Sequence, residues 1–307
     1  MSARTTDYKF EAVLGSGSFG KVHLVRKRKD RKTFVIKEQD VSQKAKTSYE
    51  MALGEIHCLR KMRHPNIIAY HDAWIEGSRI YIRMEYASRG TLKDLLERRQ
   101  NPLKNEDALY LFSQVTLGVH HIHSQKILHR DLKPENIMLT GHLGDIVKIG
   151  DFGVSSSMQG TLRSATLAGS YYFMAPEMLR GQPCDFKCDI WSMGAILYQM
   201  VTNELPFQAK NLKDLVEAVC SSRIRPIEAN TSPEVVNLVS KMLRSNPAYR
   251  PKIEQLLLCP YLVPYMIRVH LNIGRIAVSN KFQHHGASQN LNEINPFTKY
   301  LQKFQKI

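Results

Sequence analysis

The chain has 307 residues, of which 43% are hydrophobic and 23% are charged, so it can fold around a core and is not a disordered protein. Lysine and arginine number 43 against 28 acidic residues, which gives a net charge of +15. The first ten residues lack the apolar segment of a signal peptide, and no apolar run is long enough to cross a membrane. The positive charge fits four interpretations: nucleic acid, an acidic membrane surface, a polyphosphate ligand, or merely a basic protein surface.

The five cysteines are scattered along the chain, and they complete no zinc-binding set with nearby histidines. Only Cys184 and Cys188 lie close together in the sequence. Because the number is odd and no second pair accompanies them, we expect free thiols and an intracellular protein. Its predicted location is the cytoplasm, with the nucleus or the cytoskeleton as further sites.

Short stretches of alternating apolar and polar residues dominate the first part of the chain and predict β-strands. A charged segment with regularly spaced apolar residues predicts one helix among them, at 48–62. The predicted strands lie at 10–14, 21–25, 33–36, 67–75 and 80–84.

After residue 90 the apolar residues recur with the period of a helix. The last part of the chain, from Tyr265 onward, is basic and rich in asparagine and glutamine. A strand-rich part therefore precedes a helix-rich part, which predicts an α+β protein with a tail. The predicted helices lie at 92–98, 106–123, 189–202, 212–220 and 233–243.

A glycine-rich motif joins the first two predicted strands, where residues 14–22 read LGSGSFGKV and fit the pattern G-x-G-x-x-G-x-V. Its glycines would let backbone N–H groups approach the oxygens of a triphosphate: Gly15, Gly17 and Gly20. A dinucleotide-binding fold needs a helix at the third glycine, whereas here a strand continues at 21–25. The motif therefore favours a loop folded over phosphates within a hairpin.

Lys37 ends the third predicted strand, and Glu55 lies on the predicted helix that follows. Lysines are common on protein surfaces, so Lys37 indicates a functional site only if a carboxylate pairs with it. A lysine held in this way can present its ammonium to two phosphates at once. We therefore expect an ion pair between Lys37 and Glu55 beside the glycine-rich loop.

Three further motifs follow in order: HRDLKPEN at 129–136, DFG at 151–153 and APE at 175–177. Together with the glycine-rich loop and Lys37, they make the sequence resemble the eukaryotic protein kinases. The resemblance covers about residues 8–263. It implies the bilobal protein kinase fold, of class α+β, with ATP bound between the lobes.

The same resemblance implies how the chain is divided and what it binds. A kinase domain at 8–263 would consist of a small β-rich N-terminal lobe at about 8–86 and a larger helical C-terminal lobe at about 91–263, followed by a basic tail at 264–307. The expected ligands are ATP, Mg²⁺ and protein substrates that bear Ser or Thr. We expect no membrane partner, we disfavour nucleic acid, and we expect any further partner of the tail to be acidic.

Chemical roles for single residues are also implied by the resemblance. Asp131 is expected to accept or orient the proton of the substrate hydroxyl, while Asn136 and Asp151 hold Mg²⁺ ions at the phosphates. Lys133 is typical of serine/threonine kinases at this position. The implied catalytic residues are Asp131, Lys133, Asn136, Lys37 and Glu55, and the implied metal ligands are Asn136 and Asp151.

An adenine pocket with an apolar roof and floor, and with backbone hydrogen bonds at the hinge between the lobes, follows from the same resemblance. Val35 stands where the family usually has alanine, which adds bulk above the base. The implied roof is Leu14, Val22 and Val35, the floor is Met138, and the hinge residues are Glu85 and Ala87. The expected ATP site is completed by Gly15, Gly17, Gly20, Lys37 and Asp151.

Three structural contacts beside the site are implied as well. The hydroxyl of Ser170 is expected to support the catalytic loop, and Asp189 is expected to anchor the backbone of that loop. Glu177 is expected to form an ion pair with Arg250 in the larger lobe. These contacts would position the chemistry without taking part in it.

Regulation is expected through the activation segment, which lies between the DFG and APE motifs. Arg130 precedes Asp131 and supplies a cation that a phosphate on this segment can pair with. Thr166, four residues before Ser170, is the best-placed acceptor for such a phosphate, and Ser164 is the second.

Softer signals resemble the NIMA-related kinases, at residues 63–68, 81–86, 148–154, 242–251 and 269–276. Glu135 and Tyr171 depart from that pattern, which leaves the substrate preference open. One alternative is a pseudokinase-like scaffold, which the complete set of catalytic residues disfavours. Another is a basic protein that binds nucleic acid or microtubules through charge, although the basic run at 26–32 is better explained as a solvated hairpin turn.

Overall fold

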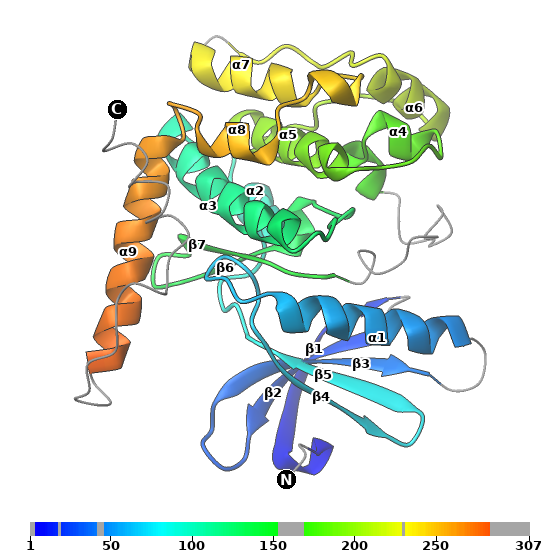
Figure 1. Ribbon diagram of the computed structural model, residues 1–307, viewed down its shortest axis with the longest axis vertical. Helices are drawn as coiled ribbons and strands as arrows, with labels where there is room; N and C mark the ends of the chain where they lie inside the picture. Colours follow the sequence, from blue (N-terminus) through cyan, green and yellow to red (C-terminus); the bar gives the residue numbers. More distant parts are fainter. Residues whose placement is uncertain (1–3, 18–19, 42–45, 153–168, 229–230, 283–307) are drawn as a thin grey trace. The chain divides into compact units, whose positions relative to one another are not determined.

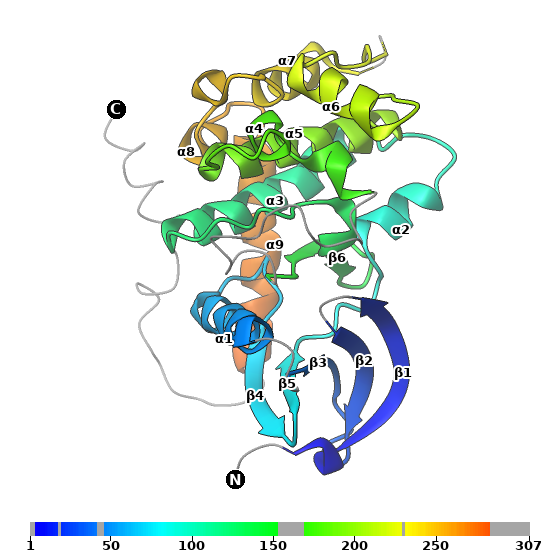
Figure 2. The same ribbon diagram turned by 90° about the vertical axis from the view of Figure 1, so that its right-hand side faces the viewer.

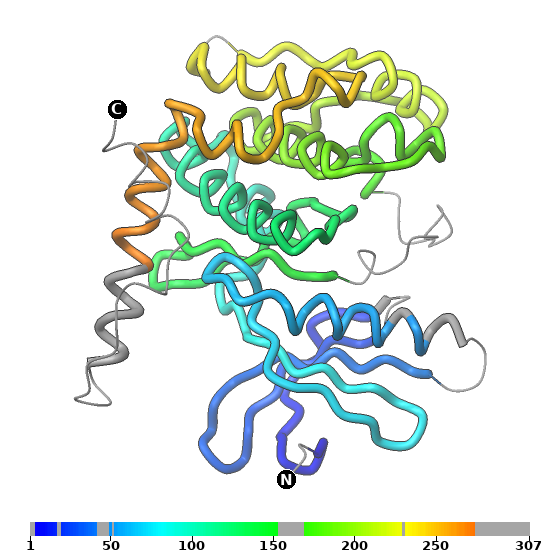
Figure 3. Tube along the Cα trace, in the orientation of Figure 1, coloured from blue at the N-terminus to red at the C-terminus, as the bar shows by residue number. Residues whose placement is uncertain are grey.

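The computed structural model describes residues 4–17, 20–41, 46–152, 169–228 and 231–282, and Figure 3 traces the course of the chain. The chain divides into two compact units, Met1–Val269 and His270–Ile307. The first unit contains a sheet-rich lobe and a helical lobe, which Figures 1 and 2 show from two directions. The expected bilobal α+β fold is therefore confirmed.

The N-terminal lobe is an antiparallel sheet with one helix. Its strands are ordered β1-β2-β3-β5-β4, so a three-stranded meander is followed by α1 and then by the hairpin that completes the sheet. Figure 1 shows α1 between the sheet and the helical lobe. The elements are β1 (Tyr8–Gly17), β2 (Gly20–Lys27), β3 (Thr33–Asp40), α1 (Lys46–Lys61), β4 (Tyr70–Glu76) and β5 (Arg79–Met84).

An aromatic cluster fills the face of the sheet that is turned away from α1. Trp74 stacks on Tyr8 with ring centroids 5.8 Å apart and on Tyr81 with centroids 5.6 Å apart. Ile36 is fully buried in the same cluster. Because Ile36 and Lys37 are neighbours in a strand, their side chains point to opposite faces. Burial of Ile36 therefore fixes the face on which Lys37 lies.

The C-terminal lobe is built around two long helices, α3 and α5, most of whose residues are buried. Figure 2 shows α4, α6, α7 and α8 beside this pair. The helices and strands are α2 (Leu92–Glu97), α3 (Asn105–Ser124), β6 (Ile137–Thr140), β7 (Ile146–Ile149), α4 (Pro176–Leu179), α5 (Phe186–Thr202), α6 (Leu212–Cys220), α7 (Pro233–Met242), α8 (Ile253–Leu257) and α9 (Val263–Phe282). Short 3₁₀ turns are η1 (Thr5–Asp7), η2 (Pro134–Asn136), η3 (Ser170–Phe173) and η4 (Pro247–Tyr249).

The segment that follows α1 joins the two lobes. The side chain of Asn66 donates hydrogen bonds to Gln114 at 3.0 Å and to the carbonyl of Val147 at 3.1 Å. The next residues pair with the backbone at the end of β7 instead of with the sheet. For this reason the predicted strand at 67–75 begins only at Tyr70.

A buried ion pair connects the start of α4 with the segment between η4 and α8. Arg250 donates from Nη1 and Nη2 to the two carboxylate oxygens of Glu177, at 2.6 and 2.8 Å. Its guanidinium also lies over the ring of Trp191, 5.0 Å from the centroid. The bidentate geometry compensates the cost of burying both charges, and the expected pair is confirmed.

The sequence missed the elements that are short or lie near the end of the kinase domain. Strands β6 and β7 have only four residues each, too few for a periodic pattern. Helix α9 starts at Val263, so the first part of the expected tail is helical, and Met266 and Val269 are buried within the first unit. No helix in the described ranges is both long and apolar enough to cross a membrane.

The cysteines differ from expectation at one place. Cys184 and Cys188 form a disulfide at the start of α5, with their Cα atoms 6.1 Å apart. The expectation of free thiols is therefore wrong for this pair, because Cys184 precedes Asp185, the N-cap of α5, and Cys188 lies in the first turn of that helix. It holds for Cys58, Cys220 and Cys259, which are free.

Candidate active site

The glycine-rich motif forms the connection between β1 and β2, as predicted for a hairpin. Gly15 pairs with Val22, and Gly17 pairs with Gly20. A β-carbon on Gly20, whose φ is +110°, would clash with the carbonyl oxygen of Glu38 in β3, whereas one on Gly15 would meet nothing within 4 Å. Gly20 is therefore required by the packing of the sheet, and Gly15 leaves open space beside the hairpin.

Apolar side chains share the face of the sheet that carries Lys37. Val22 lies directly opposite Lys37 in the β2–β3 ladder, and Val35 precedes Lys37 by two residues on β3. Residues in these positions project to the same side of a sheet. Leu14, near the end of β1, keeps 49% of its surface exposed. The expected roof residues Val22 and Val35 thus lie on one face beside the lysine.

The expected floor residue Met138 lies on β6. It forms an isolated antiparallel bridge with Thr91, just before α2. A β-carbon on Gly150 would lie 2.8 Å from Cε of Met138. Since Gly150 directly precedes Asp151, Met138 packs closely against the backbone that leads into Asp151.

The hinge leaves two backbone groups available to a ligand. The Glu85 side chain accepts a hydrogen bond from the amide of Ala69 at 3.1 Å and pairs with Lys148 at 2.9 Å. Within the described part of the chain, no other backbone group bonds to the carbonyl oxygen of Glu85 or to the amide of Ala87. A ring with one donor and one acceptor at its edge could pair with both.

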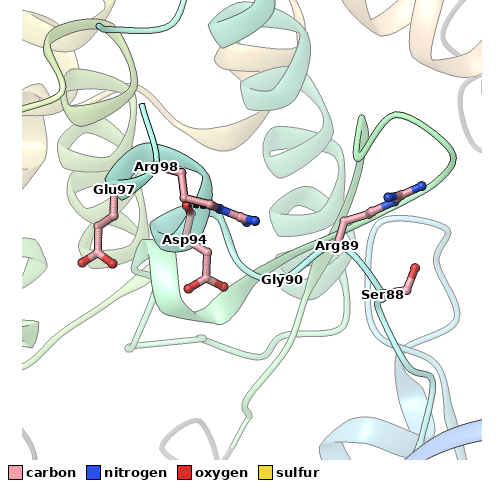
Figure 4. A pocket seen from close by; sticks show the side chains of 6 residues that line it. All are labelled: Ser88, Arg89, Gly90, Asp94, Glu97 and Arg98. Carbon is pink, nitrogen blue, oxygen red and sulfur yellow. Dashed lines mark hydrogen bonds between the residues drawn. The ribbon is translucent and has the colours of Figure 1, made fainter. Parts of the chain in front are cut away.

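A polar cavity of about 580 Å³ lies between the hinge and α2 (Figure 4). Arg89 donates to two backbone carbonyls of the β6–β7 turn and is directed away from α2. Thr91 is the N-cap of α2, and Asp94 completes the capping box by accepting from the amide of Thr91 at 2.7 Å. Figure 4 shows Asp94 and Glu97 on one side of α2. The cavity is lined by Ser88, Arg89, Gly90, Asp94, Glu97 and Arg98.

Lys37 is buried between carboxylates from the two lobes. Its Nζ donates to the oxygens of Glu55 at 2.7 and 3.0 Å and to Oδ1 of Asp151 at 3.3 Å. Gln39 donates to Glu55 as well, at 2.9 Å. Burial lowers the pKa of Lys37, but the charges of Asp151 and Glu55 outweigh burial and hold this pKa above its ordinary value. The ammonium stays charged at neutral pH, and the expected ion pair is confirmed.

The loop that carries HRDLKPEN gathers hydrogen-bond donors around Asp131. Lys133 donates from Nζ to both carboxylate oxygens of Asp131, at 3.0 and 2.8 Å, and to Oγ of Ser170 at 2.8 Å. Asn136 donates from Nδ2 to the backbone carbonyl and to Oδ2 of Asp131, at 2.7 and 3.0 Å. The carboxylate of Asp131 is therefore fixed beside the start of η3, and the expected support from Ser170 is confirmed.

The environment of Asp131 also tunes its basicity. Burial raises the pKa of this carboxyl above that of an ordinary aspartate, while the charge and the hydrogen bond of Lys133 act in the opposite direction. Burial has the larger effect, so Asp131 holds a proton more tightly than an exposed carboxylate does. A raised pKa makes the carboxylate a better acceptor for the proton of a hydroxyl.

Asp189 holds the backbone of the same loop. Its Oδ2 accepts from the amide of His129 at 3.0 Å, and its Oδ1 accepts from the amide of Arg130 at 2.9 Å. The ring of His123 lies 2.8 Å from Oδ2. Arg130 has a φ of 65°, a left-handed conformation that costs a non-glycine residue about 1–3 kcal/mol and needs such support. The expected anchoring by Asp189 is confirmed.

The oxygen donors beside Asp131 suit a hard cation. Nδ2 of Asn136 is used by Asp131, which leaves the amide oxygen for another partner. The Asp151 side chain, 38% exposed, supplies carboxylate oxygens. Mg²⁺ is typically held by one or two protein oxygens together with phosphates and water. Among the described residues no group of three His, Cys, Asp or Glu side chains could hold a metal alone, which is compatible with that mode of binding.

A two-lobed fold that places an ion-paired lysine, a partly buried loop aspartate and this oxygen pair in one site is that of a protein kinase. The sequence pattern of the protein kinase domain matches residues 8–262. Serine/threonine-protein kinase Nek8 of Danio rerio is 37% identical over 270 residues, and Nek5 of Homo sapiens is 37% identical over 257. The chain belongs to the protein kinase family and, within it, to the NIMA-related serine/threonine kinases.

The chain and its relatives differ in length. The match covers 88% of this chain but 39% of Nek8, and 83% of this chain but 36% of Nek5. Serine/threonine-protein kinase nekl-2 of Caenorhabditis elegans is 31% identical over 284 residues, which cover 88% of this chain and 78% of the relative. The chain therefore spans about two fifths of the first two relatives and most of the third.

Several members of the site were missed by sequence reasoning. Gln39 supports Glu55, and its signal was its place two residues after Lys37 on the same strand face. His123 supports Asp189 from α3, and no local pattern indicates that contact. The predicted phosphate acceptors Thr166 and Ser164 lie outside the described residues.

The pKa of Asp131 can be tested apart from any activity. Replacing Lys133 by Met removes the cation that lowers this pKa, so we expect the pKa of Asp131 to rise further. The carboxyl ¹³C chemical shift of Asp131, followed against pH, reports the change. Lys241→Met, on the surface of α7, serves as the control and leaves the titration unchanged. A titration of Asp131 that is identical with and without Lys133 contradicts the electrostatic coupling.

Proposed function

We propose that the chain is an ATP-dependent protein kinase that transfers the γ-phosphoryl group of ATP to serine and threonine hydroxyls of proteins. The observation that carries this proposal is the Asp131 carboxylate, held by Lys133 and Asn136. The same site contains the Lys37 ammonium, which is paired with Glu55 and Asp151. Because the chain spans only part of its first relatives, the activity and substrates of the whole protein form part of the proposal.

In this reaction the substrate hydroxyl oxygen forms a bond to the γ-phosphorus, and the bond from that phosphorus to the leaving oxygen of ADP breaks. Asp131 orients the hydroxyl and accepts its proton, aided by its raised pKa. Lys133, which also bonds to Ser170, keeps the carboxylate in place and adds positive charge beside the transferring group. Positioning and charge neutralisation lower the barrier, since little covalent chemistry is asked of the protein.

The nucleotide would be held by both lobes. Lys37 presents a charged ammonium to the phosphates, with Glu55 fixing its position. Asn136 and Asp151 would hold Mg²⁺, which when bound neutralises charge on the phosphates. The base would lie between the roof of Leu14, Val22 and Val35 and the floor of Met138, with Glu85 and Ala87 at its edge. The glycines Gly15, Gly17 and Gly20 would bring the hairpin backbone over the phosphates.

Two alternatives fit the described residues less well. A pseudokinase-like scaffold has no need of a lysine, two carboxylates and a partly buried loop aspartate aligned in one site. A basic protein that binds nucleic acid or microtubules by charge would not require the hydrogen bonds that Lys133 and Asn136 donate to Asp131. An intracellular location and an acidic partner for the tail at 264–307 stay predictions.

Loss of the Asp131 carboxylate tests the proposal directly. We expect wild-type protein with ATP and Mg²⁺ to phosphorylate serine and threonine peptides in a degenerate array. Asp131→Asn should transfer about 10²–10⁴ times more slowly, since an amide cannot accept the proton. Its melting temperature and ATP affinity should stay close to those of the wild type. ATP binding without transfer by the wild type favours the scaffold, and salt-sensitive binding of nucleic acid instead favours the charge-based alternative.

We further propose that a phosphate on the activation segment raises activity by pairing with Arg130, whose backbone Asp189 already holds. Thr166 is the preferred acceptor and Ser164 the second. Thr166→Ala should therefore show lower activity than the wild type after incubation with ATP, while Ser164→Ala changes it less. Phosphopeptide mass spectrometry beside the rate measurement checks the site. A Thr166→Ala protein with full activity contradicts the proposal.

A further inference from the structure

The disulfide between Cys184 and Cys188 joins two positions that differ in accessibility. Cys184 is partly exposed and lies in the connection between α4 and α5, where Gln182 and Pro183 are exposed. Cys188 lies in the first turn of α5 and is only 1% exposed. A reagent in solution can therefore approach the sulfur of Cys184 more easily than that of Cys188.

The buried sulfur faces a carboxylate. Sγ of Cys188 lies 3.1 Å from Oε1 of Glu177, the oxygen that also accepts from Nη1 of Arg250 at 2.6 Å. A sulfur in a disulfide carries no hydrogen and cannot donate to this oxygen, whereas a thiol can. Reduction would therefore give Cys188 a hydrogen-bond acceptor that is already in place, with no movement of the Glu177–Arg250 pair.

Two features make the reduced pair compatible with the fold. The two cysteines are only four residues apart, and closing a short loop removes less entropy from the unfolded chain than closing a long one. The bridge therefore stabilises the fold less than a bridge across a long loop would. The hydrogen bond from a Cys188 thiol to Glu177 would offset part of the stability that is lost with the bridge.

We propose that Cys184 and Cys188 form a reversible redox site, in which Cys184 reacts with disulfides and thiols from solution and Cys188 closes or opens the bridge. The oxidant is a low-molecular-weight disulfide, such as oxidised glutathione, and the reductant is a dithiol. The proposal does not depend on the kinase function proposed above, because it concerns only the chemistry of these two sulfurs.

Oxidation of the pair consists of two exchange reactions. The thiolate of Cys184 attacks one sulfur of the small disulfide, so that a mixed disulfide forms, the original S–S bond breaks and one thiolate leaves. The thiolate of Cys188 then attacks the sulfur of Cys184 and expels the second thiolate. The two protons of the cysteines pass through solvent to the expelled thiolates. Each small disulfide is thereby reduced to two thiols while one bridge forms in the protein.

The order of the two reactions follows from the surroundings of each sulfur. Cys188 is buried, and its ionisation would place a second negative charge beside Glu177, so it reacts slowly with a molecule from solution. Its attack on Cys184 is intramolecular and is favoured by a high effective concentration. Reduction follows the reverse path, in which the dithiol attacks Cys184 and Cys188 leaves.

The oxidation state determines which partner Cys188 has. In the disulfide, Cys188 ties the connection between α4 and α5 to the first turn of α5. In the dithiol it donates to Glu177, and the connection loses this covalent tie. Asp189 follows Cys188 directly and holds the backbone of the catalytic loop, so the redox site lies beside a support of the candidate active site.

The experiment uses the full chain, which is reduced with dithiothreitol, separated from it and exposed to oxidised glutathione, while peptide mass spectrometry identifies the product at each cysteine. The wild type should form the bridge, and dithiothreitol should reopen it in the folded protein. Cys188→Ser, which keeps a hydroxyl donor for Glu177, should accumulate a glutathione mixed disulfide at Cys184. Cys184→Ser should form the adduct at Cys188 about tenfold more slowly, because that sulfur is buried beside a carboxylate.

A matched control and a second measurement accompany these variants. Cys220→Ser, at a partly exposed cysteine that is free, should leave the reaction of the pair unchanged. Circular dichroism at each step shows whether the protein stays folded. If a serine variant does not fold, alkylation of the reduced wild type with iodoacetamide tests the same order, and Cys184 should react about tenfold faster than Cys188.

Three results would contradict the proposal. One is reaction of Cys188 in the Cys184→Ser protein, or its alkylation in the wild type, as fast as that of Cys184. Another is a wild type that forms no bridge with oxidised glutathione. The third is a bridge that dithiothreitol opens only when the protein is unfolded. None of these measurements requires phosphoryl transfer, so the redox site and the kinase function are tested independently.

Discussion

The site depends on one buried ammonium that both lobes must share. Lys37 comes from the sheet, Glu55 from α1 and Asp151 from the segment that follows β7 in the C-terminal lobe. A buried charge costs free energy unless it is paired and hydrogen-bonded, so the lysine stabilises the arrangement in which both carboxylates are close to it. The aromatic cluster behind the sheet directs Lys37 to this face, and Gln39 holds Glu55 from the same strand. Contacts with Nζ of Lys37 therefore link the sheet, α1 and the segment that carries Asp151.

The catalytic loop is held by a second buried carboxylate of similar importance. Asp189 lies fully buried in α5 and binds two successive amides of the loop, which stabilises the left-handed backbone at Arg130. Burial raises the pKa of Asp189, but the hydrogen bond and charge of His123 outweigh it and keep the carboxyl ionised. Helix α5 thus holds the backbone of the loop in position, and Asp131 directly follows the two residues that Asp189 binds. Rigid support of this kind is what a reaction driven by positioning requires.

The sequence predicted the chemistry of this protein better than the paths of its backbone. The motifs around Lys37, Asp131 and Asp151 predicted the members of the site because each combines a specific residue type with a fixed spacing. The start of β4 could not be predicted, since residues 67 and 68 look like a strand yet pair with the other lobe. Strands of four residues carry no measurable period, and contacts such as Gln39–Glu55 or His123–Asp189 join segments far apart in sequence. The sequence motif predicted that Gly20 lets the backbone approach phosphates. It did not predict that packing against Glu38 also requires a glycine at this position.

Dependence of phosphoryl transfer on the shared ammonium is tested most directly by single-turnover transfer from ATP with Mg²⁺ to a peptide, with Glu55→Gln beside the wild type. The substitution keeps the shape of the side chain and removes the charge that fixes Lys37. The predicted result is transfer slowed by about 10²–10³-fold at saturating ATP, as for other losses of preorganised electrostatics, with Glu50→Gln on the exposed side of α1 unaffected. Transfer by Glu55→Gln at the wild-type rate would contradict the dependence of the site on this ion pair.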